Sequence, residues 1–194
     1  VVASMLKEFP RSLTLLNLRG ASYVGLGKHE AAIPNYKRAI RLQPQYATAY
    51  NNLAIAMKAC GSYDEAIGNY SKATILKPDY AAAYTNLGNI LNEVGRLEDA
   101  AVALKEAIGS SPTDPHPYNI LGIVLTGLGE YAAAISAFDK VIELDKEYLE
   151  AFSGKGNALL RLGRHKEGLQ LLEYSEGVLR FNTVDGVKTE KRGG

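Results

Sequence analysis

The sequence contains 194 residues, 46% of them apolar, which is enough to bury a substantial hydrophobic core. Its net charge is +1 with 22% charged residues, and this balance excludes a broadly basic surface of the kind that binds nucleic acid. The single cysteine, Cys60, cannot form an internal disulfide, and the longest mainly apolar stretch, residues 120–129, is too short to span a membrane. We therefore expect a soluble, cytoplasmic protein with no metal, no cofactor and no nucleic-acid or membrane partner.

The first twelve residues have the pattern of a helix that ends at a proline. Val2, Leu6 and Phe9 have helical spacing, and Pro10 stands 34 residues before Pro44. Residues 1–12 are therefore expected to be the end of a truncated preceding repeat.

A period of 34 residues organises the chain from there on. Glycines return at this distance five times, at Gly27, Gly61, Gly95, Gly129 and Gly163, and small residues seven positions earlier do the same. Large residues hold equally constant places: Tyr36, Tyr70, Leu104, Phe138 and Leu172 form one series. The period predicts five repeats, residues 13–46, 47–80, 81–114, 115–148 and 149–182.

Each repeat reads as two amphipathic helices joined at its central glycine. Tyr50, Leu53, Ala54 and Met57 follow helical spacing before the glycine of the second repeat, and the same spacing resumes after it. The glycine fits a tight turn with a left-handed backbone, where a side chain would be costly. Pro44, Pro78 and Pro112 are expected to end the second helix of the first three repeats.

The last residues and the isolated reactive side chains give weaker signals. Residues 183–194 lose the helical period, and Asp185-Gly186 is a turn signal, so this segment is expected to be a tail or the start of a following segment. The sequence contains no recognised catalytic or metal-binding motif, and "GLGK" at 25–28 is interpreted as the turn of the first repeat. Cys60 is expected to be a small half-buried filler.

The repeating residues resemble the tetratricopeptide-repeat (TPR) pattern. "AYNNLAIAM" with "YDEAIGNYSKATILKP", and "AYTNLGNIL" with "LEDAAVALKEAI", match it closely, and the resemblance covers residues 13 to about 178. It implies an all-α fold, a right-handed superhelical solenoid of antiparallel helix hairpins, in which partner segments bind along a concave groove.

One side of the first helix of each repeat is predicted to face that groove. The small and large core residues lie on the opposite side at about 100° per residue, which leaves this side free. The candidate peptide-binding residues on it are Asn17, Asn51, Asn52, Ile55, Lys58, Asn86, Asn89, Asn92, Glu93, Asn119, Ile120, Ile123, Asn157 and Arg161. Asparagine amides both donate and accept hydrogen bonds, so they suit the backbone of an extended peptide. The alternative is that they only solvate a helix face.

Two known TPR binding surfaces can be compared with this set. A carboxylate clamp for acidic tails needs lysines and an arginine beside its asparagines, and this chain lacks that set. Asn52 and Asn86 instead resemble part of the asparagine ladder in the TPR arm of protein O-linked N-acetylglucosamine transferase. The resemblance is partial, because Leu18, Ile120 and Gly154 occupy the equivalent places.

These observations predict a non-catalytic scaffold that binds an extended segment of another protein. The alternative is a substrate-recruiting arm of a larger enzyme, a transferase or an oxygenase whose catalytic part would follow residue 194. Self-association through uncapped ends is a third possibility. Replacement of Asn52, Asn86 and Asn89 by Ala is expected to weaken partner binding with little change in melting temperature.

Overall fold

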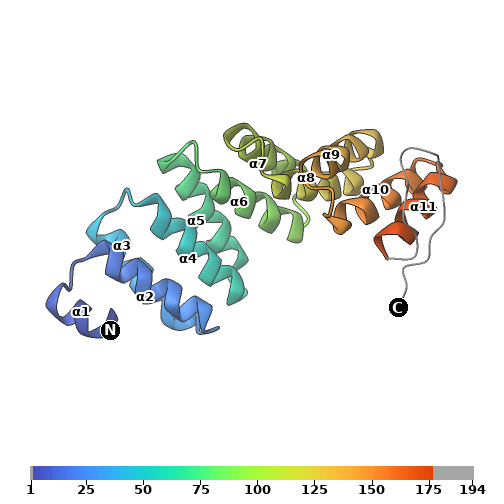
Figure 1. Cartoon of the computed structure of the whole chain (residues 1–194). Helices are drawn as coiled ribbons and strands as arrows, with labels where there is room; N and C mark the ends of the chain where they lie inside the picture. Colours follow the sequence, from blue (N-terminus) through green and yellow to red (C-terminus); the bar gives the residue numbers. More distant parts are fainter. Residues whose placement is uncertain (1, 177–194) are drawn as a thin grey trace, which may run out of the picture. The chain divides into compact units, whose positions relative to one another are not determined.

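The structure, a computed structural model, describes residues 2–176 and consists there of helices and short connections (Figure 1). The described residues form two compact units, one up to Gly95 and one from Arg96 on. The first contains α1 (Val2–Glu8), α2 (Leu13–Gly25), α3 (His29–Leu42), α4 (Ala47–Ala59), α5 (Tyr63–Leu76) and α6 (Ala81–Glu93). The second contains α7 (Leu97–Ser110), α8 (Pro115–Gly127), α9 (Tyr131–Leu144), α10 (Leu149–Arg161) and α11 (His165–Ser175). The predictions for residues 183–194 lie outside the described residues.

Consecutive helices pair as antiparallel hairpins within each unit. α2 packs on α3 and α4 on α5 in the first unit, and α8 packs on α9 and α10 on α11 in the second (Figure 1). Each hairpin also contacts the next one in its own unit, through α3 with α4 and through α9 with α10. The all-α fold of helix hairpins predicted from the period is confirmed.

The central glycines hold the sharp turns between paired helices. All five have positive φ angles, between 69° at Gly27 and 86° at Gly163, and every other described residue with a side chain has a negative φ. At the end of α4, the N–H of Gly61 donates to the carbonyl of Lys58 and the N–H of Ser62 donates to the carbonyl of Met57, both at 2.9 Å. This pair of bonds is the Schellman ending, which satisfies carbonyls that the helix leaves free.

Close contact between a small residue and an aromatic ring holds the hairpins together. A Cβ atom added to Gly20 on α2 would lie 2.5 Å from Cε1 of Tyr36 on α3, so the ring occupies the space that a side chain would need. Gly122 on α8 and Phe138 on α9 repeat this contact, with a Cβ-to-ring distance of 2.7 Å. Tyr36 is buried, and burial raises the pKa of its hydroxyl to about 12.

Arg19 and Lys155 occupy the repeat position that holds leucine in the three middle repeats, at Leu53, Leu87 and Leu121. Nζ of Lys155 on α10 forms an ion pair with Oδ1 of Asp139 at 2.5 Å. Arg19 on α2 lies over the ring of Tyr23, 5.6 Å from the ring centroid. Both charged ends therefore have partners.

Two exposed glycines of the second hairpin allow a matched test of the turn. An added Cβ meets nothing within 4 Å at either Gly61, with φ of 79°, or Gly68 inside α5. We predict that Gly61→Ala lowers the free energy of unfolding by about 1 kcal/mol, because an L-residue is strained in the left-handed region. Gly68→Ala should raise it by up to about 1 kcal/mol through helix propensity. Urea unfolding measures both changes, and equal effects would contradict this role of Gly61.

Candidate peptide-binding face

Four asparagines form a continuous chain of side-chain hydrogen bonds across α2, α4 and α6. Nδ2 of Asn86 donates to Oδ1 of Asn51 at 3.1 Å, and Nδ2 of Asn51 donates to Oδ1 of its neighbour Asn52 at 3.2 Å. Nδ2 of Asn52 then donates to Oδ1 of Asn17 at 2.8 Å. We call the side of α2, α4 and α6 that carries Asn17, Asn52, Ile55, Asn86 and Asn89 the ladder face.

The spacing of these bonds explains why they join neighbouring repeats. Asn17 and Asn52 are 35 residues apart, as are Asn51 and Asn86, one more than the period. On each first helix, one position faces the following first helix, and the next position along the chain faces the preceding one. A bond between neighbouring first helices therefore joins residues that are one position more than the period apart. The amide hydrogen bonds therefore link α2, α4 and α6, the first helices of three successive repeats.

The structure buries three of the candidate binding residues, Asn51, Asn119 and Ile120. Asn51 has 4% of its surface exposed and Asn119 has 7%, so neither presents its amide on an open face. The prediction that these two side chains are available to a peptide is corrected here. Each lies on the flank that the next first helix covers, and Asn51 spends its amide on its two asparagine neighbours. Ile120 is buried as well, at 5%.

Asn119 on α8 lacks the asparagine partner that the ladder residues have. The residue 35 positions further on is Gly154, which has no side chain to offer, and Oδ1 of Asn119 is buried without a hydrogen-bond partner among the described residues. A Cβ at Gly154 would lie 2.5 Å from Cε1 of Phe138. The Phe138 ring thus takes the space that an asparagine at position 154 would need.

The remaining candidates lie at the surface or partly exposed. Asn17, Asn52, Ile55, Asn86, Asn89 and Asn92 are half-buried in the first unit, and Asn157 and Arg161 are exposed on α10 of the second. Ile123 on α8 is 47% exposed. The sequence-based candidates did not include Leu18 on α2, which is 48% exposed beside Asn17. Leu18 occupies the same repeat position as Asn52 and Asn86, and this equivalence is the signal that could have found it.

Lys58 and Glu93 form the ion pair of the ladder face. Nζ of Lys58 on α4 lies 2.6 Å from Oε1 of Glu93 at the end of α6, and Nδ2 of Asn89 donates to the same oxygen at 3.2 Å. Their side chains are 27% and 40% exposed. Burial raises the pKa of Tyr70, and the negative charge of Glu93 raises it further.

Comparison with family models identifies the family of this chain. Family models described as TPR repeat match residues 20–59 and 56–95, and models described as Tetratricopeptide repeat match residues 81–110 and 121–176. The chain belongs to the tetratricopeptide-repeat family. No curated protein sequence matches it significantly.

Solved TPR structures share the fold. YrrB, a TPR protein with an unusual peptide-binding site, is 20% identical, with 90% of each chain covered and a TM-score of 0.77. MamA from Desulfovibrio magneticus RS-1 is 21% identical, covering 84% of this chain and 93% of its own, with a TM-score of 0.78. PilF from Pseudomonas aeruginosa is 23% identical, covering 84% and 76%, with a TM-score of 0.74. At these identities the likeness shows the fold alone.

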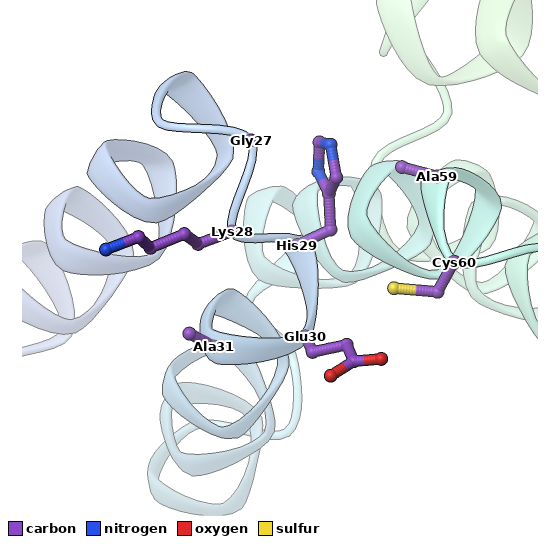
Figure 2. Close-up of a pocket in the computed structure, with 7 residues that line it drawn as sticks. All are labelled: Gly27, Lys28, His29, Glu30, Ala31, Ala59 and Cys60. Atoms are coloured by element: carbon purple, nitrogen blue, oxygen red, sulfur yellow. The ribbon is translucent and has the colours of Figure 1, made fainter.

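A pocket of this TPR chain lies at the turn of the first hairpin. Figure 2 shows the pocket of about 470 Å³, which is lined by Gly27, Lys28, His29, Glu30, Ala31, Ala59 and Cys60. Cys60 is exposed, which corrects its predicted half-buried role: it caps α4 at the corner before Gly61. The His29 ring points away from the Cys60 thiol (Figure 2).

The part of the TPR chain that the structure describes holds no group of three or more His, Cys, Asp or Glu side chains arranged to bind a metal ion. None of the helices in residues 2–176 is long and apolar enough to cross a membrane.

The hydrogen bonds of the ladder change the stability expected of its variants. Asn52 and Asn86 bond across helices, so the expectation that they can be replaced by Ala at no cost in stability does not fit the structure. Loss of such a bond costs about 1 kcal/mol, and more where a buried partner is left unsatisfied. The asparagines of the ladder hold the TPR helices together as well as lining their face.

We predict that Asn51→Ala lowers the free energy of unfolding by about 1–2 kcal/mol, because it leaves Nδ2 of Asn86 without its acceptor and Oδ1 of Asn52 without its donor. Asn92→Ala, on α6 outside the ladder, is the matched control and should change it by less than about 0.5 kcal/mol. Urea unfolding of the two variants makes the comparison. Equal destabilisation would show that the ladder does not link the helices.

Proposed function

We propose that this chain is a protein-interaction scaffold that binds an extended segment of a partner protein along the ladder face. The observation that carries the proposal is the row of partly exposed amides and apolar side chains on first helices, the side that hairpin packing leaves open. Extended peptides expose one donor and one acceptor at each residue, and amide side chains match both.

The ladder keeps hydrogen-bonding capacity for a ligand after its own bonds are made. Asn17 only accepts within the ladder, so both of its N–H groups remain for a ligand. Asn52 has one further N–H, and the carbonyl oxygen of Asn86 is not used by its neighbours in the ladder. Three half-exposed asparagines can therefore hold backbone groups of a peptide while they stay fixed by one another. Fixed side chains lose little conformational entropy on binding.

Apolar side chains on the same helices add non-directional contact. Leu18 on α2 and Ile55 on α4 flank the asparagines of the ladder face. A single hydrogen bond contributes only about 1 kcal/mol net, so affinity has to accumulate along several helices. The fold shared with YrrB, whose structure contains a peptide-binding site, supports the same class of ligand.

The test uses phage-displayed random peptides selected on the immobilised full chain, followed by fluorescence anisotropy with the enriched sequences as synthetic peptides. We predict that Leu18→Arg combined with Asn89→Arg weakens binding at least about tenfold, because two bulky charges then stand on the ladder face. The matched control is Ile75→Arg combined with Val102→Arg, which adds the same charge at residues that are 70% and 63% exposed on the second helices α5 and α7.

The control pair should leave the affinity of the enriched peptides within about twofold of the unmodified chain. Peptides that bind the Leu18 and Asn89 double variant as well as the control would place the site elsewhere. A selection that enriches no peptide would also contradict the proposal.

A further inference from the structure

We propose that the Lys58–Glu93 pair is a selectivity element of the ladder face, which favours a peptide segment without charged side chains where it crosses α4 and α6. The inference rests on the proposed function and adds the chemical class of the ligand. Lys58 and Glu93 are the charged residues of the ladder face, and the two side chains form an ion pair with each other.

The charge count on the ladder face is simple. Eighteen positions of α2, α4 and α6 lie on the predicted free side: residues 14, 17, 18, 21, 24, 25, 48, 51, 52, 55, 58, 59, 82, 85, 86, 89, 92 and 93. Lys58 and Glu93 are the two among these eighteen that are charged, and their Nζ and Oε1 atoms are 2.6 Å apart. The net charge of the face is therefore zero, and it offers no free charge for a ligand to pair with.

Glu93 is held from two sides. Nδ2 of Asn89 donates to the oxygen that also contacts Lys58, at 3.2 Å, so the carboxylate has an amide and an ammonium as partners. The pair is also partly removed from water, with 27% and 40% of the two side chains exposed. Partial burial weakens screening by solvent, so the charges attract each other more strongly than a fully exposed pair.

A charged peptide side chain gains little at this place. A ligand carboxylate that approaches Lys58 has to displace Glu93, and a ligand ammonium that approaches Glu93 has to displace Lys58. Either exchange leaves one charge of the face without its partner, which offsets the new contact. An uncharged side chain meets no such cost and leaves the pair intact. Removal of one partner should reverse this preference in a direction set by the charge that remains.

The experiment uses a neutral synthetic peptide taken from the selection on the full chain. Each of its positions is replaced in turn by Asp and by Lys, and the affinities of the two scans are measured by fluorescence anisotropy. With the unmodified chain, the positions over the pair should tolerate neither substitution. With Lys58→Met, which leaves Glu93, Lys at those positions should improve binding up to about fivefold relative to the neutral peptide.

Glu93→Gln, which leaves Lys58, should give the same gain for Asp in place of Lys. Lys140→Met is the matched control, because Lys140 pairs with Glu143 at 2.9 Å on α9, outside both first-helix faces. It should leave both scans unchanged. The exchange Lys58→Glu with Glu93→Lys restores a neutral pair and should restore the preference for uncharged residues.

Identical Asp and Lys scans for the unmodified chain, Lys58→Met and Glu93→Gln would overturn the inference, because the pair would then serve stability alone. That result leaves the proposed function standing as long as binding still depends on Leu18 and Asn89. Binding that survives the Leu18 and Asn89 double variant overturns the proposed function, and the selectivity inference with it.

Discussion

The close approach of two helices, made possible by a missing or minimal side chain, is the constraint on which the rest of this chain depends. Gly20 leaves room for the ring of Tyr36, and Gly122 leaves room for the ring of Phe138. In the last hairpin, a Cβ at Gly156 would lie 2.9 Å from the carbonyl oxygen of Gly168, so two backbones touch where both side chains are absent. Dense packing of this kind leaves no freedom in the distance between the helices.

That constraint determines which side of the first helices faces outward. The buried side of α2 and of α4 is taken up by the hairpin partner, α3 or α5, and by the neighbouring hairpin of the same unit, so the other side of each helix faces outward. On α2, α4 and α6 this side holds an amide chain that is bonded along its length, from Asn86 to Asn17. The same side chains therefore stabilise the stacking of the helices and remain available, in part, to a ligand.

The two units differ in how they treat this face. In the first, asparagines occur at both places that the spacing of 35 residues brings together, and the bonds form. In the second, Asn119 meets Gly154, and its carbonyl oxygen is left buried without a partner among the described residues. Ile123 on α8 and Asn157 on α10 are exposed and belong to no such chain of bonds among the described residues.

Much of this could be predicted from the sequence, because repetition reveals which residues share an environment. The glycine period identified the turns, and the small and large series identified the hairpin contacts, as Gly20 and Tyr36 show. The burial of Asn51 and Asn119 could not be predicted in this way. A helical projection describes one helix at a time, and these residues lie on the flank that a neighbouring helix covers.

Other features depended on detail that the period does not contain. Cys60 follows the last residue of α4, so its side chain lies at the turn and is exposed. The helical spacing used for the core residues does not extend to this position. The amide ladder was signalled by the spacing of 35 residues between Asn17 and Asn52 and between Asn51 and Asn86, a spacing that differs from the period by one. A search restricted to equivalent positions does not find it.

A double-mutant cycle between Gly20 and Tyr36 tests the central contact most directly. Gly20→Ala alone places a methyl group against the Tyr36 ring, and Tyr36→Leu alone removes the ring in favour of the residue type found at Leu104 and Leu172. If the ring fills the space above Gly20, the double variant should be more stable than the sum of the single losses predicts, by at least about 1 kcal/mol in urea unfolding. Strictly additive losses would show that the two helices do not meet through this pair.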